Sequence, residues 1–189
     1  MTLVRDHARH FETLFAGNDD PWNLRSKRGE RHKRETIRRA LGAARLGWGA
    51  ELGCGNGITT RDLAPKFAHL LAVDGSASAV ALTQREVAGL GHVEVRQATL
   101  PIALERAKYD AIVVSEVLYY IPARSLKTTL SESFEALRPG GLFVSTNHIT
   151  HFDDAECTNA ELNRLTRSVF GREVRSLAGD RWRCDIYRK

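Results

Sequence analysis

The sequence predicts an α/β fold, a doubly wound sheet with helices on both faces. Short apolar runs alternate with helix-like segments through most of the chain, and such alternation is typical of a mostly parallel sheet. Residues 109–115 (Y-D-A-I-V-V-S) form an almost continuous apolar run, as expected of a central strand covered on both faces. Residues 172–177 and 183–188 look like strands joined by a short turn, which indicates an antiparallel hairpin at one end of the sheet.

The first predicted elements precede the sheet. An amphipathic helix is predicted over 3–15, ended by the turn-forming G-N-D-D-P of 17–21. A second helix, arginine-rich on one side, is predicted over 30–41. A short buried strand near 48–52 then begins the sheet, and a glycine-rich loop leads from it into a helix over about 58–66.

The strand–helix pattern then repeats. Residues 69–74 are predicted to form a strand that ends in Asp74, and Ser76 is a good N-cap for a helix that runs to about Val87. The R-P-G-G of 138–141 is expected to end a later helix. The remaining strands are expected over 92–96 and 142–147, and the remaining helices over 122–137 and 159–170.

Composition indicates a single soluble domain. A chain of 189 residues with 42% apolar and 27% charged residues can bury a substantial core. Cys54, Cys157 and Cys184 form no CxxC pair, so neither a zinc ribbon nor a disulfide framework is supported. The first ten residues hold no apolar signal region and no stretch is long enough to span a membrane. A cytoplasmic location without a membrane partner is therefore expected.

The formal net charge of +5 is concentrated in residues 25–45, which hold nine Lys or Arg against Glu30 and Glu35. One interpretation is a basic patch for nucleic acid. The other, which carries more weight, is a solvated helix face with a few salt bridges. No aromatic residues alternate with these charges, so a base-stacking platform is not indicated.

Residues 50–60 read A-E-L-G-C-G-N-G-I-T-T. Glycine at 53, 55 and 57 lets a backbone turn tightly and approach a ligand without a Cβ in the way. In doubly wound sheets, ligands bind at the carboxyl ends of the strands, where a following helix also offers free N–H groups. A dinucleotide fingerprint would need glycine in place of Ile58, and a Walker loop would need GK[ST]. The loop therefore fits neither of these sites.

Four segments together carry a family resemblance. They are E-L-G-C-G-N-G at 51–57, the strand-ending Asp74, S-E-V-L-Y-Y at 115–120 and L-R-P-G-G at 137–141. In this combination the chain resembles the class I S-adenosylmethionine-dependent methyltransferases over roughly residues 47–189. The resemblance implies a Rossmann-like, seven-stranded sheet, mostly parallel with an antiparallel last strand. It also implies S-adenosyl-L-methionine as methyl donor, S-adenosyl-L-homocysteine as product, and no metal.

The resemblance also implies contacts with the cofactor. The three glycines would lie against its methionine and ribose portions, and Glu51 would orient the loop or the cofactor's ammonium group. Asp74 matches the acid that accepts hydrogen bonds from both ribose hydroxyls, although it could also be a simple turn acid before Ser76. Thr99 stands at or next to the place where the family often has an adenine-binding acid or amide. The implied cofactor-binding set is Glu51, Gly53, Gly55, Gly57, Asp74, Gly75, Ser76, Thr99, Leu100, Glu116, Trp22 and Arg31.

Further motifs bear on the methyl acceptor. The [ND]PP[YFW] tetrad of exocyclic-amine nucleic acid methyltransferases is absent after the fourth strand, and no cysteine is placed for cytosine-C5 chemistry. D-D-P-W-N-L at 19–24, E-R at 30–31, S-E-V-L-Y-Y-I at 115–121 and R-W-R-C-D-I-Y-R at 181–188 resemble the nodulation protein S family. Members of that family N-methylate the free amine of a deacetylated chitooligosaccharide. Arg28 and Gly29 stand where that family usually has Trp-Tyr.

This second resemblance implies two parts, an N-terminal helical lid over 1–46 and the cofactor-binding methyltransferase domain over 47–189. Trp22, Arg31, Glu116, Tyr119 and Tyr120 would line the pocket under the lid. Trp22 could equally be a core anchor that pins the N-terminal segment. The predicted function is methyl transfer to a small-molecule acceptor, an amine of a saccharide-like or other polar metabolite. The alternatives are an RNA methyltransferase that uses the 25–45 face, and a non-catalytic cofactor binder.

Residues 147–154 (N-H-I-T-H-F-D-D) follow the fifth strand on the ligand-bearing edge. His148 is the preferred general base there, because it stands at the carboxyl end of a strand and an imidazole titrates near neutral pH. A metal site at His148, His151, Asp153 and Asp154 is a weaker alternative, because histidines three apart in a loop fix no geometry. The predicted catalytic set is His148, Glu116, Tyr119 and Tyr120.

Overall fold

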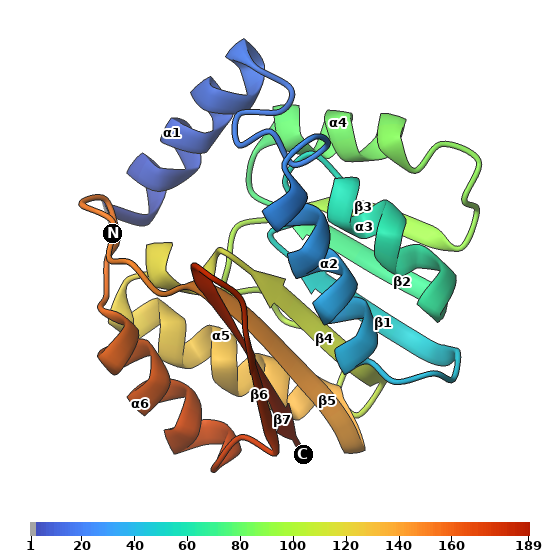
Figure 1. Cartoon of the computed structure of the whole chain (residues 1–189), viewed down its shortest axis with the longest axis vertical. Helices are drawn as coiled ribbons and strands as arrows, with labels where there is room; N and C mark the ends of the chain where they lie inside the picture. The colour runs from blue at the N-terminus through green and yellow to red at the C-terminus, as the bar shows by residue number, and fades with distance from the viewer. Residues whose placement is uncertain (1–2) are drawn as a thin grey trace.

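A seven-stranded sheet forms the centre of the chain, which a computed structural model describes over residues 3–189 (Figure 1). The five parallel strands come first in the sheet, β7 runs antiparallel to β5, and β6 runs antiparallel to β7. This confirms the predicted mostly parallel sheet with a late antiparallel hairpin. In sheet order the strands are β3 (Val93–Gln97), β2 (Phe67–Asp74), β1 (Leu46–Leu52), β4 (Tyr109–Ser115), β5 (Leu137–His148), β7 (Trp182–Arg188) and β6 (Arg175–Ala178).

Helices cover both faces of the sheet and its ligand-bearing edge. They are α1 (Leu3–Gly17), α2 (Arg28–Ala40), α3 (Ile58–Leu63), η1 (Ala64–Lys66), α4 (Ala77–Glu86), η2 (Leu118–Tyr120), α5 (Ala123–Ala136) and α6 (Asn159–Phe170). None of the helices described between residues 3 and 189 is long and apolar enough to cross a bilayer. Met1 and Thr2 of the expected N-terminal lid lie outside the described residues.

Strand β4 shows why helices cover both faces of the sheet. Ile112 and Val114 are fully buried against α5 and α6, whereas Ala111 and Val113 are fully buried against α2 and α3. Because successive side chains of a strand point to opposite faces, a continuous apolar run fits only a strand packed on both sides. Each large apolar side chain buried in this way contributes roughly 1.5–3 kcal/mol.

Local residue chemistry sets several element ends. The Ser76 Oγ accepts a hydrogen bond from the Ala79 backbone N–H at 3.0 Å, so the predicted N-cap of α4 is confirmed. The helix expected over 58–66 divides into α3 and the 3-10 turn η1. Pro65 lies in that turn, where its missing N–H interrupts the α-helical ladder.

The R-P-G-G segment belongs to the beginning of β5 rather than to a loop. The register between β4 and β5 shifts there, as at a β-bulge. The Gly140 N–H donates to the Lys189 carbonyl at 2.8 Å, and the Lys189 N–H donates to the Gly141 carbonyl at 3.0 Å. The segment therefore ends α5 as predicted, but it also pairs with the last residue of the chain and lengthens the strand.

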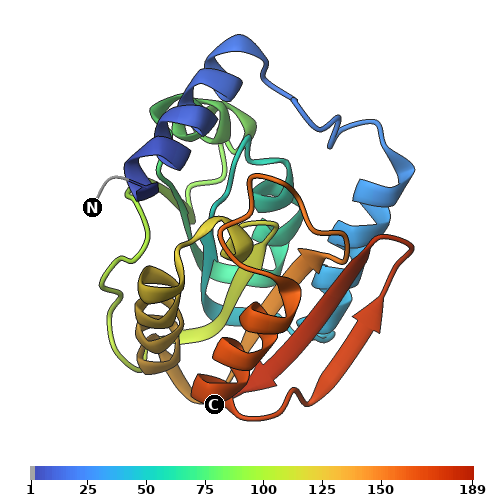
Figure 2. The same cartoon turned by 90° about the vertical axis from the view of Figure 1, so that its left-hand side faces the viewer.

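Helix α1 lies beyond the carboxyl ends of the strands, beside α4 (Figure 2). Phe15 packs there with Ala79 and Leu82 of α4, and Phe11 packs against the same cluster. The segment before the sheet therefore reaches over the edge where parallel strands present their ligand-binding loops.

Candidate active site

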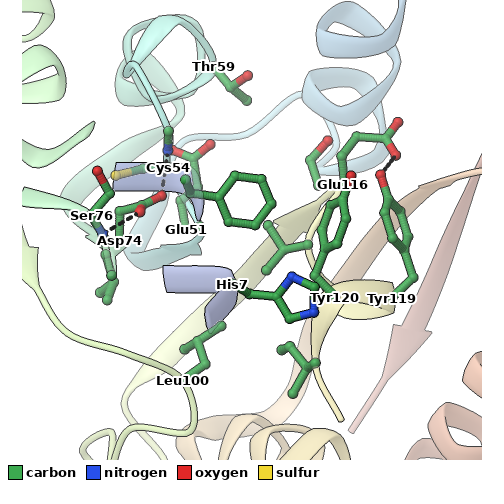
Figure 3. A pocket seen from close by; sticks show the side chains of 18 of the residues that line it. His7, Glu51, Cys54, Thr59, Asp74, Ser76, Leu100, Glu116, Tyr119 and Tyr120 are labelled. Atoms are coloured by element: carbon green, nitrogen blue, oxygen red, sulfur yellow. Dashed lines mark hydrogen bonds between the residues drawn. The ribbon is translucent and has the colours of Figure 1, made fainter. Parts of the chain in front are cut away.

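A cavity of about 440 Å³ opens at the carboxyl ends of the central strands. Its volume falls within the roughly 300–1,000 Å³ of small-molecule sites. Its walls come from the loops after β1, β2, β3, β4 and β5 and from the segment that precedes the sheet. Figure 3 shows Asp74 and Ser76 on one side of this space, with Glu116, Tyr119 and Tyr120 on the other.

The glycine loop approaches the cavity through backbone alone. Gly53 and Gly55 line it, and their φ angles are +80° and +55°. A Cβ on Gly53 would collide with Val117 Cγ2, so this position requires glycine for both conformation and space. The Gly53 N–H donates to the Val73 carbonyl at 2.7 Å, which ties the loop to β2.

Gly57 has a different role from the one expected. It does not line the cavity, although its φ of +79° also lies in the left-handed region. A Cβ at Gly57 would lie 2.7 Å from the Thr83 Cα. The third glycine therefore permits close packing of the loop against α4, and it is not among the residues that line the cavity.

Asp74 ends β2 and faces the glycine loop. Its Oδ2 accepts a hydrogen bond from the Gly55 N–H at 2.9 Å, and its Oδ1 accepts one from the Ser76 N–H at 3.0 Å. Burial raises its pKa above the usual aspartate value, against these two hydrogen bonds. The carboxylate is therefore held rigidly at the cavity wall, together with Gly75 and Ser76.

Glu51 is the most deeply buried acid of the site, with 2% of its surface exposed. Its Oε2 atom has no hydrogen-bond partner among the residues that the structure describes. Burial raises its pKa to about 8, because a low-dielectric site disfavours the charged form. A buried acceptor without a donor is costly in a folded protein and is typical of a ligand site.

Thr99 and Leu100 follow β3 and line the cavity next to Gly75. A Cβ on Gly75 would lie 3.4 Å from the Thr99 Oγ1. The Thr99 hydroxyl is therefore close to the end of β2, on the side of the cavity that also holds Asp74.

Glu116 is the centre of a hydrogen-bond network on the other side of the cavity. Its Oε1 lies 2.7 Å from the Lys33 Nζ, and its Oε2 accepts hydrogen bonds from the Tyr119 hydroxyl and the His148 backbone N–H, both at 2.8 Å. Its φ of +60° is unusual for a residue with a side chain. Such backbone strain is maintained only where the surroundings determine it, often at functional sites.

Lys33 was not among the residues predicted for the site. Only 6% of its surface is exposed, and its Nζ also lies 2.8 Å from Glu30. Burial acts to lower its pKa, but the ion pairs with Glu116 and Glu30 outweigh burial and raise the pKa above the usual value. Glu30, Lys33 and Arg34 recur at helical spacing, which is the signal that could have identified this face of α2.

Arg31 was expected in the pocket, but its side chain is exposed and does not line the cavity. Residues 30, 33 and 34 of α2 do line it. Because a helix turns about 100° per residue, Arg31 points away from that face. Arg34 instead donates to the Leu24 carbonyl at 2.8 Å and pairs with Asp62 at 2.7 Å.

The other basic residues of 25–45 include several with close acidic partners. Arg38 and Arg39 both lie 2.9 Å from Glu35, and Arg25 lies 2.6 Å from Glu86. These pairs favour a solvated helix face with salt bridges over a continuous nucleic-acid surface.

Aromatic rings close the cavity from the N-terminal segment. Trp22 lines it and contacts Phe11 and Phe15, with ring centroids 6.3 and 5.4 Å apart. Tyr120 lies edge-on to Phe11 at 5.0 Å. Trp22 keeps 39% of its surface exposed, so it is a partly open wall rather than a fully buried core anchor.

His148 lines the cavity, but its ring is engaged locally. Its Nδ1 accepts a hydrogen bond from the Thr150 N–H at 3.1 Å. A neutral imidazole in this arrangement carries its proton on Nε2, and its lone pair on Nδ1 is occupied. This geometry disfavours the role of general base that the sequence suggested.

The cysteines and the histidine-rich loop offer little to the chemistry. All three cysteines are free and buried, and burial raises the pKa of the Cys54 thiol well above its usual value. Such a thiol is a poor nucleophile. Among His7 and residues 9–189, whose side chains the structure describes, there is no group of three or more His, Cys, Asp or Glu that could hold a metal ion.

Comparison with known proteins agrees with this geometry. Residues 50–141 match the family described as "Methyltransferase domain". Nodulation protein S of Sinorhizobium fredii is 29% identical over 160 residues, which cover 83% of this chain and 71% of that protein. Nodulation protein S of Azorhizobium caulinodans is 33% identical over 127 residues, or 66% of this chain and 61% of that protein.

The fold has a close counterpart among solved structures. The crystal structure of the N-methyltransferase NodS from Bradyrhizobium japonicum, in complex with S-adenosyl-L-homocysteine, superposes with a TM-score of 0.82 at 22% identity. The match covers 96% of this chain and 97% of that one. The chain therefore contains a methyltransferase domain, and it is similar to nodulation protein S in sequence and to NodS in fold.

Proposed function

We propose that the protein transfers a methyl group from S-adenosylmethionine to an amine of a small polar molecule. The observation that carries this proposal is the cluster of carboxylates on the acceptor side of the cavity. Glu30, Glu116 and Asp154 line it against Lys33, beside the ring of Tyr120. Carboxylates and an aromatic face attract a protonated amine and the sulfonium of the cofactor alike.

The opposite end of the cavity fits the cofactor. The unpartnered Oε2 of Glu51 can accept a hydrogen bond from the ammonium group of the methionine portion. We assign to Asp74 the hydrogen bonds from the ribose hydroxyls, because its contacts with Gly55 and Ser76 hold both of its carboxylate oxygens at the cavity wall. The backbone at Gly53 and Gly55 allows close approach without a Cβ. When bound, S-adenosylmethionine supplies an electrophilic methyl group on a positively charged sulfur.

The residues around Glu116 position the acceptor in this proposal. Burial raises the pKa of Tyr119 far above the usual tyrosine value, so its hydroxyl remains a hydrogen-bond donor to Glu116. Burial likewise raises the pKa of Tyr120 to about 12. Methyl transfer is an in-line displacement in which the protein chiefly aligns the two reactants and excludes water. Tyr119, Tyr120 and the His148 backbone therefore support alignment rather than nucleophilic catalysis.

The relatives named nodulation protein S and the N-methyltransferase NodS support nitrogen as the methylated atom. A saccharide-like carrier is supported by the aromatic surfaces of Trp22 and Phe11, on which a sugar ring can stack. Arg28 and Gly29 are exposed at the beginning of α2. They provide no aromatic ring there, so the carrier need not be the chitooligosaccharide that the sequence resemblance implies.

Methyl transfer from labelled S-adenosylmethionine tests this proposal. The purified protein is incubated with glucosamine oligomers, simple alkylamines, the N-acetylated forms of both, and total RNA. We expect label in free amines and none in the N-acetylated controls, with mass spectrometry placing the methyl group on nitrogen. Label confined to RNA, or to hydroxyl oxygens of the N-acetylated controls, would contradict the proposal.

A further inference from the structure

His7, Phe11 and Phe15 follow one another at intervals of four along α1. Residues four apart lie on the same side of a helix, and all three line the cavity. The His7 ring projects into this space beside Tyr120 (Figure 3), with the two ring centroids 5.9 Å apart. Helix α1 therefore brings an imidazole to the acceptor side of the site.

The His7 ring is held by a carboxylate from the far end of the chain. Its Nε2 lies 2.8 Å from the Oε1 of Glu156, and the two side chains are 20% and 19% exposed. The Glu156 backbone N–H donates to the Tyr119 carbonyl at 2.8 Å. Glu156 is thereby fixed relative to the residues around Glu116, and His7 is fixed by Glu156.

This arrangement selects one tautomer of the imidazole. A carboxylate can only accept a hydrogen bond, so the ring must carry a proton on Nε2. The lone pair of a neutral ring is then on Nδ1, which has no hydrogen-bond partner among residues 9–189. A histidine oriented by a carboxylate through one nitrogen, with its second nitrogen open, is the usual arrangement of a general base.

Three other titratable groups at this end of the cavity, His148, Glu116 and Tyr120, are less suited to the role. The Nδ1 lone pair of His148 is occupied by the Thr150 N–H. Both oxygens of Glu116 accept hydrogen bonds already, from Lys33 on one side and from Tyr119 and His148 on the other. Tyr120 faces His7, and burial, followed by the charge of Asp154, keeps its phenol protonated.

We propose that His7 is the general base that deprotonates the acceptor amine, with Glu156 as its orienting partner; this rests on the proposed function. The acceptor arrives as R–NH₃⁺ and gives one proton to Nδ1 of His7, which becomes an imidazolium paired with Glu156. The lone pair of R–NH₂ then forms the N–CH₃ bond while the C–S bond of the donor breaks, and its electron pair stays on sulfur. The products are R–NH₂⁺–CH₃ and S-adenosylhomocysteine, and the imidazolium returns its proton to solvent.

Because His7 lies on α1, the base belongs to the segment that covers the cavity. Helix α1 is anchored at its other end by Glu12, which accepts hydrogen bonds from the Ser76 and Ser78 hydroxyls at 2.7 and 2.6 Å. Deprotonation of the amine would therefore be confined to the state in which α1 is docked and water is partly excluded from the site.

Two measurements test the assignment, and the first needs no acceptor. Long-range ¹H–¹⁵N spectra of the labelled protein, with S-adenosylhomocysteine present and His7→Gln used for assignment, report the tautomer of each histidine. We expect His7 to be protonated on Nε2, and we expect Glu156→Gln to disturb this state. A proton on Nδ1, or equal averaging of both tautomers, would overturn the assignment.

The second measurement compares kcat/KM across pH for wild type, His7→Gln, Glu156→Gln and the matched control His10→Ala. His10 is exposed on the same helix and does not line the cavity. We expect the kcat of His7→Gln to fall about 10²–10⁴-fold. We also expect this variant to lack the decline in rate at low pH that protonation of an imidazole base causes. Added imidazole should partly restore the activity of a further variant, His7→Ala. We expect Glu156→Gln to lose at least about tenfold, because an amide can hold the wrong tautomer.

Two outcomes would overturn the inference and are distinguishable. If wild type binds S-adenosylhomocysteine but methylates no amine, the proposed function fails and the base assignment fails with it. If wild type methylates an amine and His7→Gln does so at the same rate with the same pH profile, the base assignment fails alone.

Discussion

The Nζ atom of Lys33 lies 2.7 Å from the Oε1 atom of Glu116, although the two residues are 83 positions apart in the chain. The pair connects α2, which precedes the sheet, with the end of β4 at the centre of the sheet. A contact of this length between a buried ammonium and a carboxylate is a charge-assisted hydrogen bond. The pair therefore fixes α2 to the end of β4 at the cavity.

Replacing Lys33 with Met is expected to lower the free energy of unfolding by about 3 kcal/mol, because Glu30 and Glu116 would be left close together without their cation. Denaturant unfolding measures this loss. The control is Arg39→Met on the same helix, whose side chain is 71% exposed beside Glu35, where less than about 1 kcal/mol should be lost. Equal losses in the two variants would contradict the structural role of the Lys33 pair.

Glu51 is expected to release a proton when the cofactor binds. Its pKa of about 8 means that it is largely protonated at pH 7 in the cofactor-free protein, whereas an ammonium partner favours the carboxylate. Binding of S-adenosylmethionine at pH 7 should therefore release up to roughly 0.9 proton. Calorimetry in buffers of different ionisation enthalpy measures this number, and Glu51→Gln should abolish it. Unchanged proton release in that variant would exclude Glu51 as the source.

The raised pKa of Glu51 also makes the stability of the cofactor-free protein depend on pH. The folded state keeps a proton on Glu51 up to about pH 8, whereas the unfolded chain loses it near 4.5. The contribution of this group to stability is therefore complete below about pH 4.5 and is lost as the pH rises toward 8. Thermal unfolding of wild type and Glu51→Gln is measured between these pH limits. The melting temperature of wild type should fall as the pH rises, and that of the variant should fall less.

Gly53→Ala is expected to destabilise the fold by about 2–4 kcal/mol, since both the φ of +80° and the contact with Val117 oppose a side chain. Gly89→Ala separates the two effects. Gly89 has a φ of +85° but no atom within 4 Å of an added Cβ, so only the conformational cost of about 1 kcal/mol should remain. Chemical denaturation of both variants measures the difference in their free energies of unfolding. Similar losses of stability would show that Val117 moves aside without an energetic cost, which would contradict the steric part of the prediction.

Glu12 is expected to control the docking of α1. Hydrogen bonds from Ser78 and Ser76 lower its pKa to about 2, so its contribution is complete above the unfolded value of 4.5 and is lost as the pH falls toward 2. Glu12→Gln should increase amide hydrogen exchange in α1 by about 5–30-fold, the equivalent of about 1–2 kcal/mol for hydrogen bonds to a charged group. Exchange in β4 should remain unchanged. The control is Glu105→Gln in the exposed connection that follows β3, and equal exchange in both variants would contradict the anchoring role.

Local sequence patterns were sufficient for much of the fold. The apolar run of 109–115 matches β4 residue for residue, and the helix predicted over 159–170 matches α6, whose capping box at Thr158 and Glu161 fixes its beginning. The glycine loop and Asp74 face each other as expected. These features depend on periodicity, caps and the common edge of a parallel sheet, all of which are local in the sequence.

Contacts between distant segments could not be predicted in the same way. His7 and Glu156 are 149 residues apart, and only the docking of α1 over the loop after β5 brings them together. Arg31 was placed in the site on the strength of a resemblance, whereas the helical register of α2 turns it outward and turns Lys33 inward. The pairing of R-P-G-G with Lys189 likewise depends on where the last strand joins the sheet.

Binding of S-adenosylhomocysteine to wild type and to Asp74→Ala, measured by titration calorimetry, tests the location of the cofactor most directly. Asp74 lines the cavity between the glycine loop and Thr99. Wild type should bind one molecule per chain, and Asp74→Ala should bind it at least about 100-fold more weakly, because two hydrogen bonds to a charged acceptor are worth about 3 kcal/mol. Asp180→Ala, in the exposed turn between β6 and β7, should bind as wild type does. Equal affinity of the folded Asp74→Ala variant would contradict a cofactor site at this end of the cavity.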